Sequence, residues 1–406
     1  MMTTTTIANN VPALDEDPWS DETLLNPYPM HERLREAGPV TFLPRYGVYA
    51  VARYEQIVEV ASNWETFSSA AGVGLQDPRD PAYFRNPGPL LESDPPDHTR
   101  VRKLFSPLVS APSLKRLRET ATPTASALVD AVLAAGPDID GVRELALAFP
   151  MRVLPDAVGM PKEGRENLIP YGELTFNGIG PENELFHKAL AAAGDAQVWI
   201  ADAMKRENLA PDGMGAMLYT FVDSGDITED QAGRLVRTFL GAGIDTTVSA
   251  IGGALMLFAQ NPEQWEKVRE NRALIRPAFD EVIRVISPAQ TFARLATHDT
   301  TIGGQDITAD SRIVLFYGAG NRDPRRWDRP EEFDIERRTT GHLGFGHGIH
   351  GCAGQMVARL EAELLFNALA DRVHSIELTG TPTWHLNNTL RSLEELPIRL
   401  HTDGNG

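Results

Sequence analysis

The chain has 406 residues and a formal net charge of −18 at pH 7, since 38 Lys and Arg face 56 Asp and Glu. An apolar share of 42% is enough for a large core, which excludes disorder as the main state. The single cysteine, Cys352, excludes an intramolecular disulfide and a cysteine-rich zinc site, and the acidic excess without a basic stripe argues against nucleic-acid binding. The sequence has neither a secretory leader nor 18 consecutive apolar residues, so we expect a cytoplasmic protein that does not bind membranes.

The first elements follow a polar, low-complexity run at the N-terminus, and we expect residues 1–17 to form a disordered tail. Between residues 40 and 51, β-branched and aromatic side chains flank a Pro/Gly break, which predicts a hairpin. The elements that follow are too interwoven to divide. Residues 18–406 are therefore expected to form a single domain.

Helical periodicity dominates from about residue 110 to residue 371. Strand patterns interrupt it at residues 300–316, around Gly303 and Gly304, and return at residues 396–401. A helix-rich chain with strands near both ends predicts a mainly α fold with small β-sheets, in the α+β class.

One predicted helix is unusually long. Thr228 and Gln231 have the spacing of a capping box, and apolar periodicity then runs from Glu229 to Ala259, a length of about 46 Å. Two glycines and three polar side chains interrupt this pattern at residues 241–247. Because each glycine costs about 1 kcal/mol relative to alanine, the break indicates a place where a ligand approaches the backbone or where chemistry occurs.

The strongest signal is the glycine-rich loop around the cysteine, residues 345–354. Glycines permit a tight loop with positive φ and let a flat ligand lie against the backbone. A helical pattern follows directly, and the N–H groups at its start stabilise a thiolate. The sequence therefore places Cys352 as an anionic sulfur ligand or as a nucleophile.

Three other interpretations of the cysteine stay open at this point. It is a small buried hydrophobe, a zinc ligand together with His342, His347 and His350, or a hydrolase nucleophile with a histidine base. The glycine pattern argues against the first, and the crowded ligand spacing argues against the second. The third lacks an orienting partner and an oxyanion hole near the loop.

The loop resembles the haem-binding signature of the cytochrome P-450 family, the haem-thiolate monooxygenases, at Phe345, Gly346, Gly348, His350, Cys352 and Gly354. The resemblance covers nearly the whole chain. It implies the fold of that family, with the long central helix crossing the haem, and a haem b whose iron is ligated by the Cys352 thiolate.

Two further segments share this resemblance. Glu281 and Arg284 look like the family's Glu-x-x-Arg pair, with Arg337 implied as the third charged partner. Asp245 and Thr246 match the oxygen-activating segment, which implies that they are the acid and the alcohol of a proton relay. A structural alternative for Thr246 is a hydroxyl that bonds back to the carbonyl four residues earlier.

The two haem propionates are anions that need paired donors. By resemblance these donors are His98, Arg102, Arg294 and His350. The alternative for each is a solvated surface side chain.

Several segments resemble one bacterial subfamily more closely, the one that oxidises para-substituted benzoic acids. They are residues 72–75, 91–96, 176–184, 237–247, 322–327 and 387–391. By this resemblance the carboxylate end of the pocket is formed by Arg85 and Thr238 with Arg237 behind, and the ring is enclosed by Leu91, Phe176, Ile179, Ala242 and Phe292. The pairing matters because an unpaired buried carboxylate costs several kcal/mol.

The chain departs from the subfamily at three pocket positions. Gly88 and Thr238 stand where the subfamily has serine, and Ile179 stands where it has a second phenylalanine. Gly88 removes a hydroxyl donor and Ile179 widens the pocket, so affinity and the tolerated substituents are expected to differ.

The resemblance predicts O-demethylation or hydroxylation of para-substituted benzoates such as 4-methoxybenzoate. It implies O2 as co-substrate and a transient iron–sulfur ferredoxin with an NAD(P)H-dependent reductase, since the chain carries no flavin or nicotinamide fingerprint. The alternatives are a monooxygenase of another aromatic acid or phenol ether, and a non-catalytic haem-binding protein.

Overall fold

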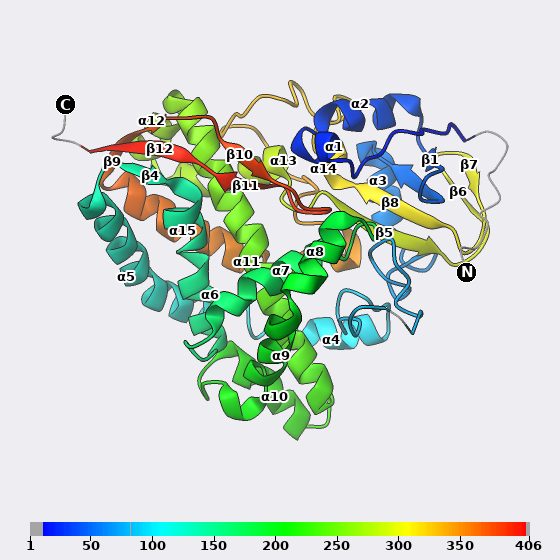
Figure 1. Ribbon diagram of the computed structural model, residues 1–406, viewed down its shortest axis with the longest axis horizontal. Coiled ribbons are helices and arrows are strands. Elements are labelled where there is room, and N and C mark those ends of the chain that lie inside the picture. Colours follow the sequence, from blue (N-terminus) through cyan, green and yellow to red (C-terminus); the bar gives the residue numbers. More distant parts are fainter. Residues whose placement is uncertain (1–10, 82, 403–406) are drawn as a thin grey trace.

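A computed structural model describes residues 11–81 and 83–402 (Figure 1). Its α-helices are α1 (Asp21–Leu25), α2 (Tyr28–Ala37), α3 (Tyr54–Ser62), α4 (Asp97–Phe105), α5 (Ala111–Ala135), α6 (Pro150–Val158), α7 (Leu168–Asn177), α8 (Glu184–Ala192), α9 (Gly194–Ala203), α10 (Met214–Asp223), α11 (Glu229–Gln260), α12 (Pro262–Glu270), α13 (Ile275–Ile286), α14 (Tyr317–Gly320) and α15 (Gln355–Ala370). The strands are β1 (Thr41–Leu43), β2 (Val48–Val51), β3 (Phe67–Ser68), β4 (Asp138–Asp140), β5 (Thr291–Ala296), β6 (Thr300–Ile302), β7 (Gln305–Ile307), β8 (Arg312–Phe316), β9 (Val373–Leu378), β10 (Thr383–His385), β11 (Ser392–Glu395) and β12 (Pro397–Thr402).

Small sheets lie at the two ends of a helical body, and the β10–β11 pair lies between them, which confirms the predicted mainly α class (Figure 1). The larger sheet has the order β1-β2-β8-β5-β3, and the β1–β2 pair is the hairpin predicted at residues 40–51. β6 and β7 form a second hairpin around Gly303 and Gly304, which both have positive φ. The three-stranded sheet β4-β12-β9 lies at the other end, and β5 was missed because its residues carry no alternating pattern.

The N-terminal prediction was wrong for residues 11–17. The backbone of Phe42 in β1 accepts a hydrogen bond from Leu14 and donates one to Pro12, because edge strand β1 offers unpaired backbone groups to any neighbouring segment. Residues 1–10 of the predicted tail lie outside the described residues. That residues 18–406 form a single domain stays a prediction.

Helix α11 is the long central helix predicted from the sequence. Thr228 caps it with the expected box, since its hydroxyl accepts from Gln231 N–H and the Gln231 side chain accepts from Thr228 N–H. In the part of the chain that the structure describes, α11 is the one helix long and apolar enough to cross a membrane. However, 72% of its most apolar 18-residue stretch is buried inside the protein. Its apolar character therefore belongs to the core.

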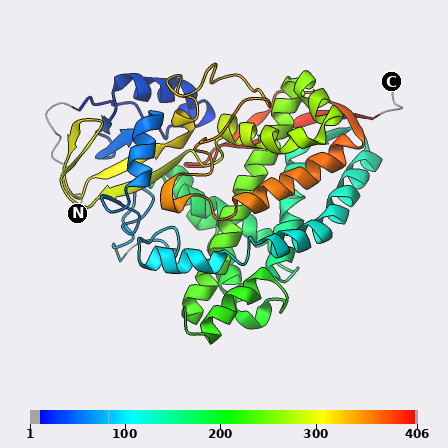
Figure 2. The same ribbon diagram turned by 180° about the vertical axis from the view of Figure 1, so that it is seen from behind.

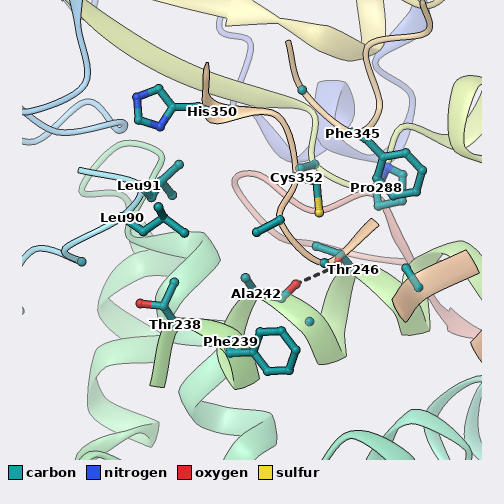
Figure 3. Close-up of a pocket in the computed structure, with 18 of the residues that line it drawn as sticks. Leu90, Leu91, Thr238, Phe239, Ala242, Thr246, Pro288, Phe345, His350 and Cys352 are labelled. Atoms are coloured by element: carbon teal, nitrogen blue, oxygen red, sulfur yellow. Dashed lines mark hydrogen bonds between the residues drawn. The ribbon is translucent and has the colours of Figure 1, made fainter. Parts of the chain in front are cut away.

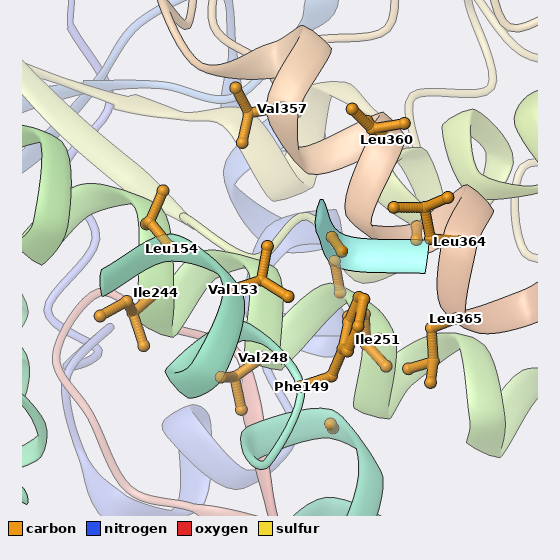
Figure 4. Packing of buried hydrophobic residues seen from close by; sticks show 14 of the residues in the cluster. Phe149, Val153, Leu154, Ile244, Val248, Ile251, Val357, Leu360, Leu364 and Leu365 are labelled. Carbon is orange, nitrogen blue, oxygen red and sulfur yellow. The ribbon is translucent and has the colours of Figure 1, made fainter. Parts of the chain in front are cut away.

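The main core lies where α11 crosses α6 and α15 (Figures 2 and 4). Ile244, Val248 and Ile251 of α11 pack between Phe149 and the α6 side chains on one side and the leucines of α15 on the other. Each such side chain contributes about 1.5–3 kcal/mol when fully buried. This packing fixes α11 relative to α15, the helix that follows the cysteine loop.

Two glycines in the middle of α11, Gly241 and Gly243, serve packing between helices. A Cβ at Gly243 would lie 2.6 Å from Leu154 Cδ2 of α6, and a Cβ at Gly241 would lie 3.3 Å from Tyr171 of α7. Both glycines also line the cavity, in line with the expectation that the break marks a place where a ligand approaches the backbone. Their small size also lets α6 and α7 approach the middle of α11.

Candidate functional site

A cavity lies between α11 and the cysteine loop (Figure 3). The sequence-predicted residues that line it are Arg85, Leu91, His98, Arg102, Phe176, Ile179, Arg237, Thr238, Ala242, Thr246, Phe292, Arg294, Phe345, His350, Cys352 and Gly354. Four predicted residues are not among its lining residues: Asp245, Glu281, Arg284 and Arg337. Residues from segments as distant as 85 and 354 thus meet around one space.

The cysteine loop holds its thiol toward α11. Gly346 and Gly348 have φ values of 73° and 68°, which L side chains rarely adopt, and a Cβ at Gly348 would collide with the Ala61 carbonyl of α3. The loop closes through a 2.7 Å hydrogen bond from the Cys352 N–H to the Phe345 carbonyl. Figure 3 shows the sulfur pointing into the cavity.

The electrostatics of the thiol are set by burial. Burial raises the pKa of Cys352 above its ordinary value, although the Gly354 and Gln355 N–H groups donate to the sulfur and lower it. The sequence suggested that the N–H groups at the start of α15 stabilise a thiolate. In the structure they lower the pKa of Cys352, but burial raises it by more. Arg102 and Arg359 also lower the pKa of Cys352, and a cation bound inside the cavity would favour the thiolate further.

A second group of side chains at the cavity offers donors without acceptors. Both ring nitrogens of His98 and Nε2 of His350 are buried without a hydrogen-bond partner, and the two rings lie 4.5 Å apart. Arg294 is 3% exposed, and its Nη1 donates to the Ala293 carbonyl at 2.7 Å. Burial, followed by Arg294, lowers the pKa of His350 to about 2, so its ring is neutral and this end attracts anions through Arg102 and Arg294.

The competing interpretations of the cysteine lack geometric support. Within residues 11–81 and 83–402, no three His, Cys, Asp or Glu side chains are grouped so as to hold a metal ion, which removes the zinc site. Among the same residues no histidine is hydrogen-bonded to the sulfur, so a nucleophile–base pair is absent from the structure.

Asp245 and Thr246 diverge from the same turn of α11. Thr246 faces the cavity, and its hydroxyl donates to the Ala242 carbonyl at 2.7 Å, the back-bonded arrangement that the structural alternative described (Figure 3). The oxygen keeps its lone pairs free to accept. Asp245 points away toward α7. Burial, followed by the charge of Glu173, raises the pKa of its carboxyl to about 8.

Arg85 lines the predicted carboxylate end, but its charge is already paired. Its guanidinium donates to both oxygens of Glu92, at 2.7 and 2.9 Å, and Glu92 also accepts from the Gly88 N–H. Burial acts to lower the pKa of Arg85, but the Glu92 carboxylate raises it overall. Glu92 was not predicted from the sequence. The signal that could have identified it is a carboxylate only seven residues after Arg85 in the chain.

Arg237 is the cation at this end without a carboxylate. Its Nη2 donates to the Asn86 carbonyl at 2.9 Å, and among the described residues it forms no ion pair. Burial, followed by Arg85 and Arg234, lowers its pKa. The Thr238 hydroxyl donates to the Arg234 carbonyl, and a Cβ at Gly88 would lie 3.4 Å from the Thr238 oxygen.

Apolar side chains form the walls between these ends. Phe176, Ile179 and Phe292 belong to one cluster with Leu390. The sequence did not identify Leu90, Phe239 and Pro288, which also line the cavity (Figure 3). Another unpredicted lining residue is Glu361 of α15, whose Oε1 lacks a partner and whose pKa burial raises to about 8.

The predicted charged triad lies outside the cavity and braces the cysteine loop region. The Arg284 guanidinium donates to both Glu281 oxygens at 2.7 and 2.8 Å, and Arg337 Nε donates to Glu281 at 3.0 Å. Arg284 and Glu281 are fully buried. Because removing one partner leaves a buried charge, this triad fixes α13 to the segment that leads into the loop.

The fold is mainly α, and its cavity is lined by the Cys352 thiol and by the nitrogen donors of His98, Arg102, Arg294 and His350. Residues 203–372 match the family model described as Cytochrome P450. The chain is 46% identical to Cytochrome p450 CYP199A2 of Rhodopseudomonas palustris, over 96% of this chain and 95% of that relative. It therefore belongs to the cytochrome P450 family.

Other members are more distant. The chain is 30% identical to the beta-dihydromenaquinone-9 omega-hydroxylase of Mycobacterium tuberculosis, over 95% of this chain and 78% of that protein. The structure of cytochrome P450 CREJ in complex with (4-ethylphenyl) dihydrogen phosphate superposes with a TM-score of 0.85 at 27% identity, covering 95% of this chain and 99% of that one. The predicted fold and family are thus confirmed.

As a family member, the protein is a haem monooxygenase that uses O2 and electrons from a redox partner, with haem iron ligated by Cys352. The residues fit that group. Bound iron would place positive charge beside the buried Cys352 thiol, and the haem propionates would accept from the N–H groups of His98 and His350. The individual roles of the other site residues stay predictions.

Proposed function

We propose that this enzyme oxidises para-substituted benzoic acids and removes the methyl group of 4-methoxybenzoate. The observation that carries the proposal is the charge layout of the cavity: apolar walls, with Arg237 at one end as a cation that has no carboxylate partner among the described residues. A benzoate supplies the missing anion and fills the apolar space with its ring.

Both Arg237 and Thr246 of α11 line the cavity. They are nine residues apart, which is about 14 Å along a helix at 1.5 Å per residue. A benzoate whose carboxylate lies near Arg237 therefore directs its para substituent toward the region of Thr246 and Cys352. Phe176, Ile179 and Phe292 contact the ring from the sides in this orientation.

A structural relative lends chemical support. The ligand named for cytochrome P450 CREJ, (4-ethylphenyl) dihydrogen phosphate, is a para-substituted aromatic ring with an anionic group opposite the substituent. The benzoate subfamily resembled by this chain takes ligands of the same pattern. A ring with one anionic and one reactive end is thus a chemistry that this fold accommodates.

The proposed reaction is the O-demethylation of 4-methoxybenzoate by O2. When bound, haem supplies O2 activation. One oxygen atom enters the methyl C–H bond, the other leaves as water with two electrons and two protons, and the resulting hemiacetal releases formaldehyde and the phenol. Arg237 and Thr238 orient the acid, and Asp245 with Thr246 delivers the protons. A ferredoxin with its reductase supplies the electrons in the cytoplasm.

The test is a panel of para-substituted benzoates and their methyl esters, scored by the spin-state shift of the haem. Binding of 4-methoxybenzoate is expected to weaken by at least about tenfold in Arg237→Gln, because a buried carboxylate loses its charged donor, while the neutral ester is little affected. Arg206→Gln is the control, since Arg206 pairs with Asp223 at the surface. Equal losses for acid and ester in Arg237→Gln contradict the proposal.

A further inference from the structure

A chain of titratable side chains links the surface to the neighbourhood of Asp245. His385 of β10 contacts two carboxylates: its Nε2 lies 2.9 Å from Glu173 Oε2 of α7, and its Nδ1 lies 2.5 Å from Glu394 Oε2 of β11. The Glu394 side chain is 59% exposed, whereas those of His385 and Glu173 are 35% and 30% exposed. Exposure thus decreases along the series from Glu394 inward.

The inner end of this series lies beside Asp245. The Asp245 carboxyl packs against Gly172, where a Cβ would collide with it, and Gly172 directly precedes Glu173. The two charged groups that act on Asp245 are Glu173 and His385. The absence of a side chain at position 172 therefore lets α7 bring Glu173 next to the acid of α11.

The proton affinities of the two ends are matched. Removal of water, followed by the Glu173 charge, raises the pKa of Asp245 to about 8. The hydrogen bond to Glu173 is the main cause that raises the pKa of His385 to about 9, with Glu394 adding to it. At pH 7 Asp245 is therefore protonated and His385 is a cation that donates from both ring nitrogens, so a proton moves between them at small cost in free energy.

We propose that Glu394, His385 and Glu173 form the path by which protons from solvent reload Asp245 during turnover. This inference rests on the proposed role of Asp245 as the acid that feeds Thr246. The three residues act through Asp245 and do not touch the substrate, so they are positioning residues of the proton path.

Each transfer conserves protons. His385 gives its Nε2 proton to Glu173 and keeps the proton on Nδ1. The neutral ring then turns so that its bare nitrogen faces Glu394, takes a proton that Glu394 has received from solvent water, and becomes a cation again. Glu173 passes the proton to Asp245 after Asp245 has given its own toward the cavity. The structure contains no hydrogen bond between Glu173 and Asp245, both of which it describes, so a water molecule or a rotation of the Glu173 carboxyl completes this step.

The first test measures the Asp245 carboxyl directly, in the full-length holoprotein. The infrared band of the protonated carboxyl is assigned by its loss in Asp245→Asn and followed as a function of pH. We expect a midpoint near 8. His385→Asn removes a cation and moves the midpoint up, whereas Glu173→Gln removes an anion and moves it down, each by on the order of one pH unit.

The opposite directions of the two midpoint shifts distinguish an electrostatic interaction with Asp245 from a general disturbance of the fold. Midpoints that stay fixed, or that move in the same direction in both variants, overturn the inference. The matched control is His401→Asn, because His401 forms a similar surface pair with Glu377 at 2.8 Å on a different sheet. This readout does not depend on which substrate is oxidised, so it is independent of failure of the proposed function.

A second variant covers the case in which His385→Asn does not fold. Glu394→Gln changes an exposed side chain, and the His385 ring is followed by nuclear magnetic resonance. Its pKa is expected to fall from about 9 toward the ordinary 6.5. Turnover of 4-methoxybenzoate at pH 7 in this variant is expected to slow severalfold with a larger solvent isotope effect; an unchanged His385 pKa together with unchanged turnover overturns the path.

Discussion

The thiol end and the arginine end of the cavity are built in different ways. The thiol end is one contiguous loop, residues 345–354, and its geometry follows from glycines at Gly346 and Gly348. The arginine end combines Arg85, Gly88 and Glu92 from the segment before α4 with residues of α11. The first is encoded locally, whereas the second exists only after folding.

This difference determines what each end can tolerate. A local loop has a single ligand atom with no substitute, since Cys352 is the chain's only cysteine. The arginine end has two cations and one internal carboxylate, so its net charge can be shifted in either direction. Variants at the thiol end should therefore abolish thiolate ligation of the haem. Variants at the arginine end should raise or lower the affinity for the substrate carboxylate.

The largest effect is expected for Cys352→Ser. A serine oxygen does not replace the thiolate, so the red-shifted absorbance of the ferrous carbon monoxide complex should disappear completely. The measurement is the absorption spectrum of purified, haem-loaded protein. His347→Asn is the control, because His347 belongs to the same loop but does not line the cavity; a serine variant that retains the band would disprove the assignment.

The next effect concerns α11, which connects the two ends. In Thr246→Ala the cavity loses the hydroxyl of the proposed proton relay, so NADH is still consumed through the redox partners but electrons are diverted to hydrogen peroxide. We expect product per NADH to fall by about tenfold or more. Thr122→Ala is the matched control, since the Thr122 hydroxyl of α5 makes the same back-bond, to the Arg118 carbonyl at 2.7 Å, and Thr122 does not line the cavity. Unchanged coupling in the Thr246 variant would remove its role.

A smaller, opposite effect is expected at the arginine end for Glu92→Gln. The change frees the charge of Arg85, so affinity for the 4-methoxybenzoate anion should rise by about tenfold while affinity for its methyl ester stays constant. The same change leaves a buried cation unpaired, and the melting temperature should fall. Affinity is measured by spin-state titration. Loss of acid binding would mean that Glu92 positions Arg85 for the substrate instead of competing for it.

The features that the sequence predicted correctly are the locally encoded ones, as at the thiol end of the cavity. The capping box at Thr228, the hairpin of residues 40–51 and the triad around Glu281 depend on neighbours or on a strong motif, and the structure contains all three. The pairing of Phe42 with residues 12 and 14 was missed because it depends on an edge strand. The position of Thr246 in the cavity was predicted, but its proton-delivery role stays a prediction.

The parts that could not be predicted are contacts between distant segments. Glu173 and His385 are 212 residues apart, and neither carries a local pattern that marks it as a partner of Asp245. Likewise, nothing in the sequence near Leu154 explains Gly243, whose small size matters only because α6 crosses α11 there. Such pairings arise from packing, so a single sequence contains no local signal for them.

The smallest effect should come from restoring a hydroxyl at the arginine end with Gly88→Ser. Position 88 has room, because an added Cβ would meet the Thr238 oxygen at 3.4 Å and Glu92 Oε2 at 3.6 Å, and its φ is not positive. A serine there offers the substrate carboxylate one more neutral donor, worth about 0.5–1.5 kcal/mol, or roughly two- to tenfold in affinity. The comparison of acid with methyl ester decides the cause: a gain confined to the acid means that the added hydroxyl binds the carboxylate, whereas an equal gain for both means that the serine only fills space. A loss confined to the acid would indicate that the hydroxyl bonds to Glu92 and tightens its pairing with Arg85, so that the arginine end is controlled by the internal carboxylate.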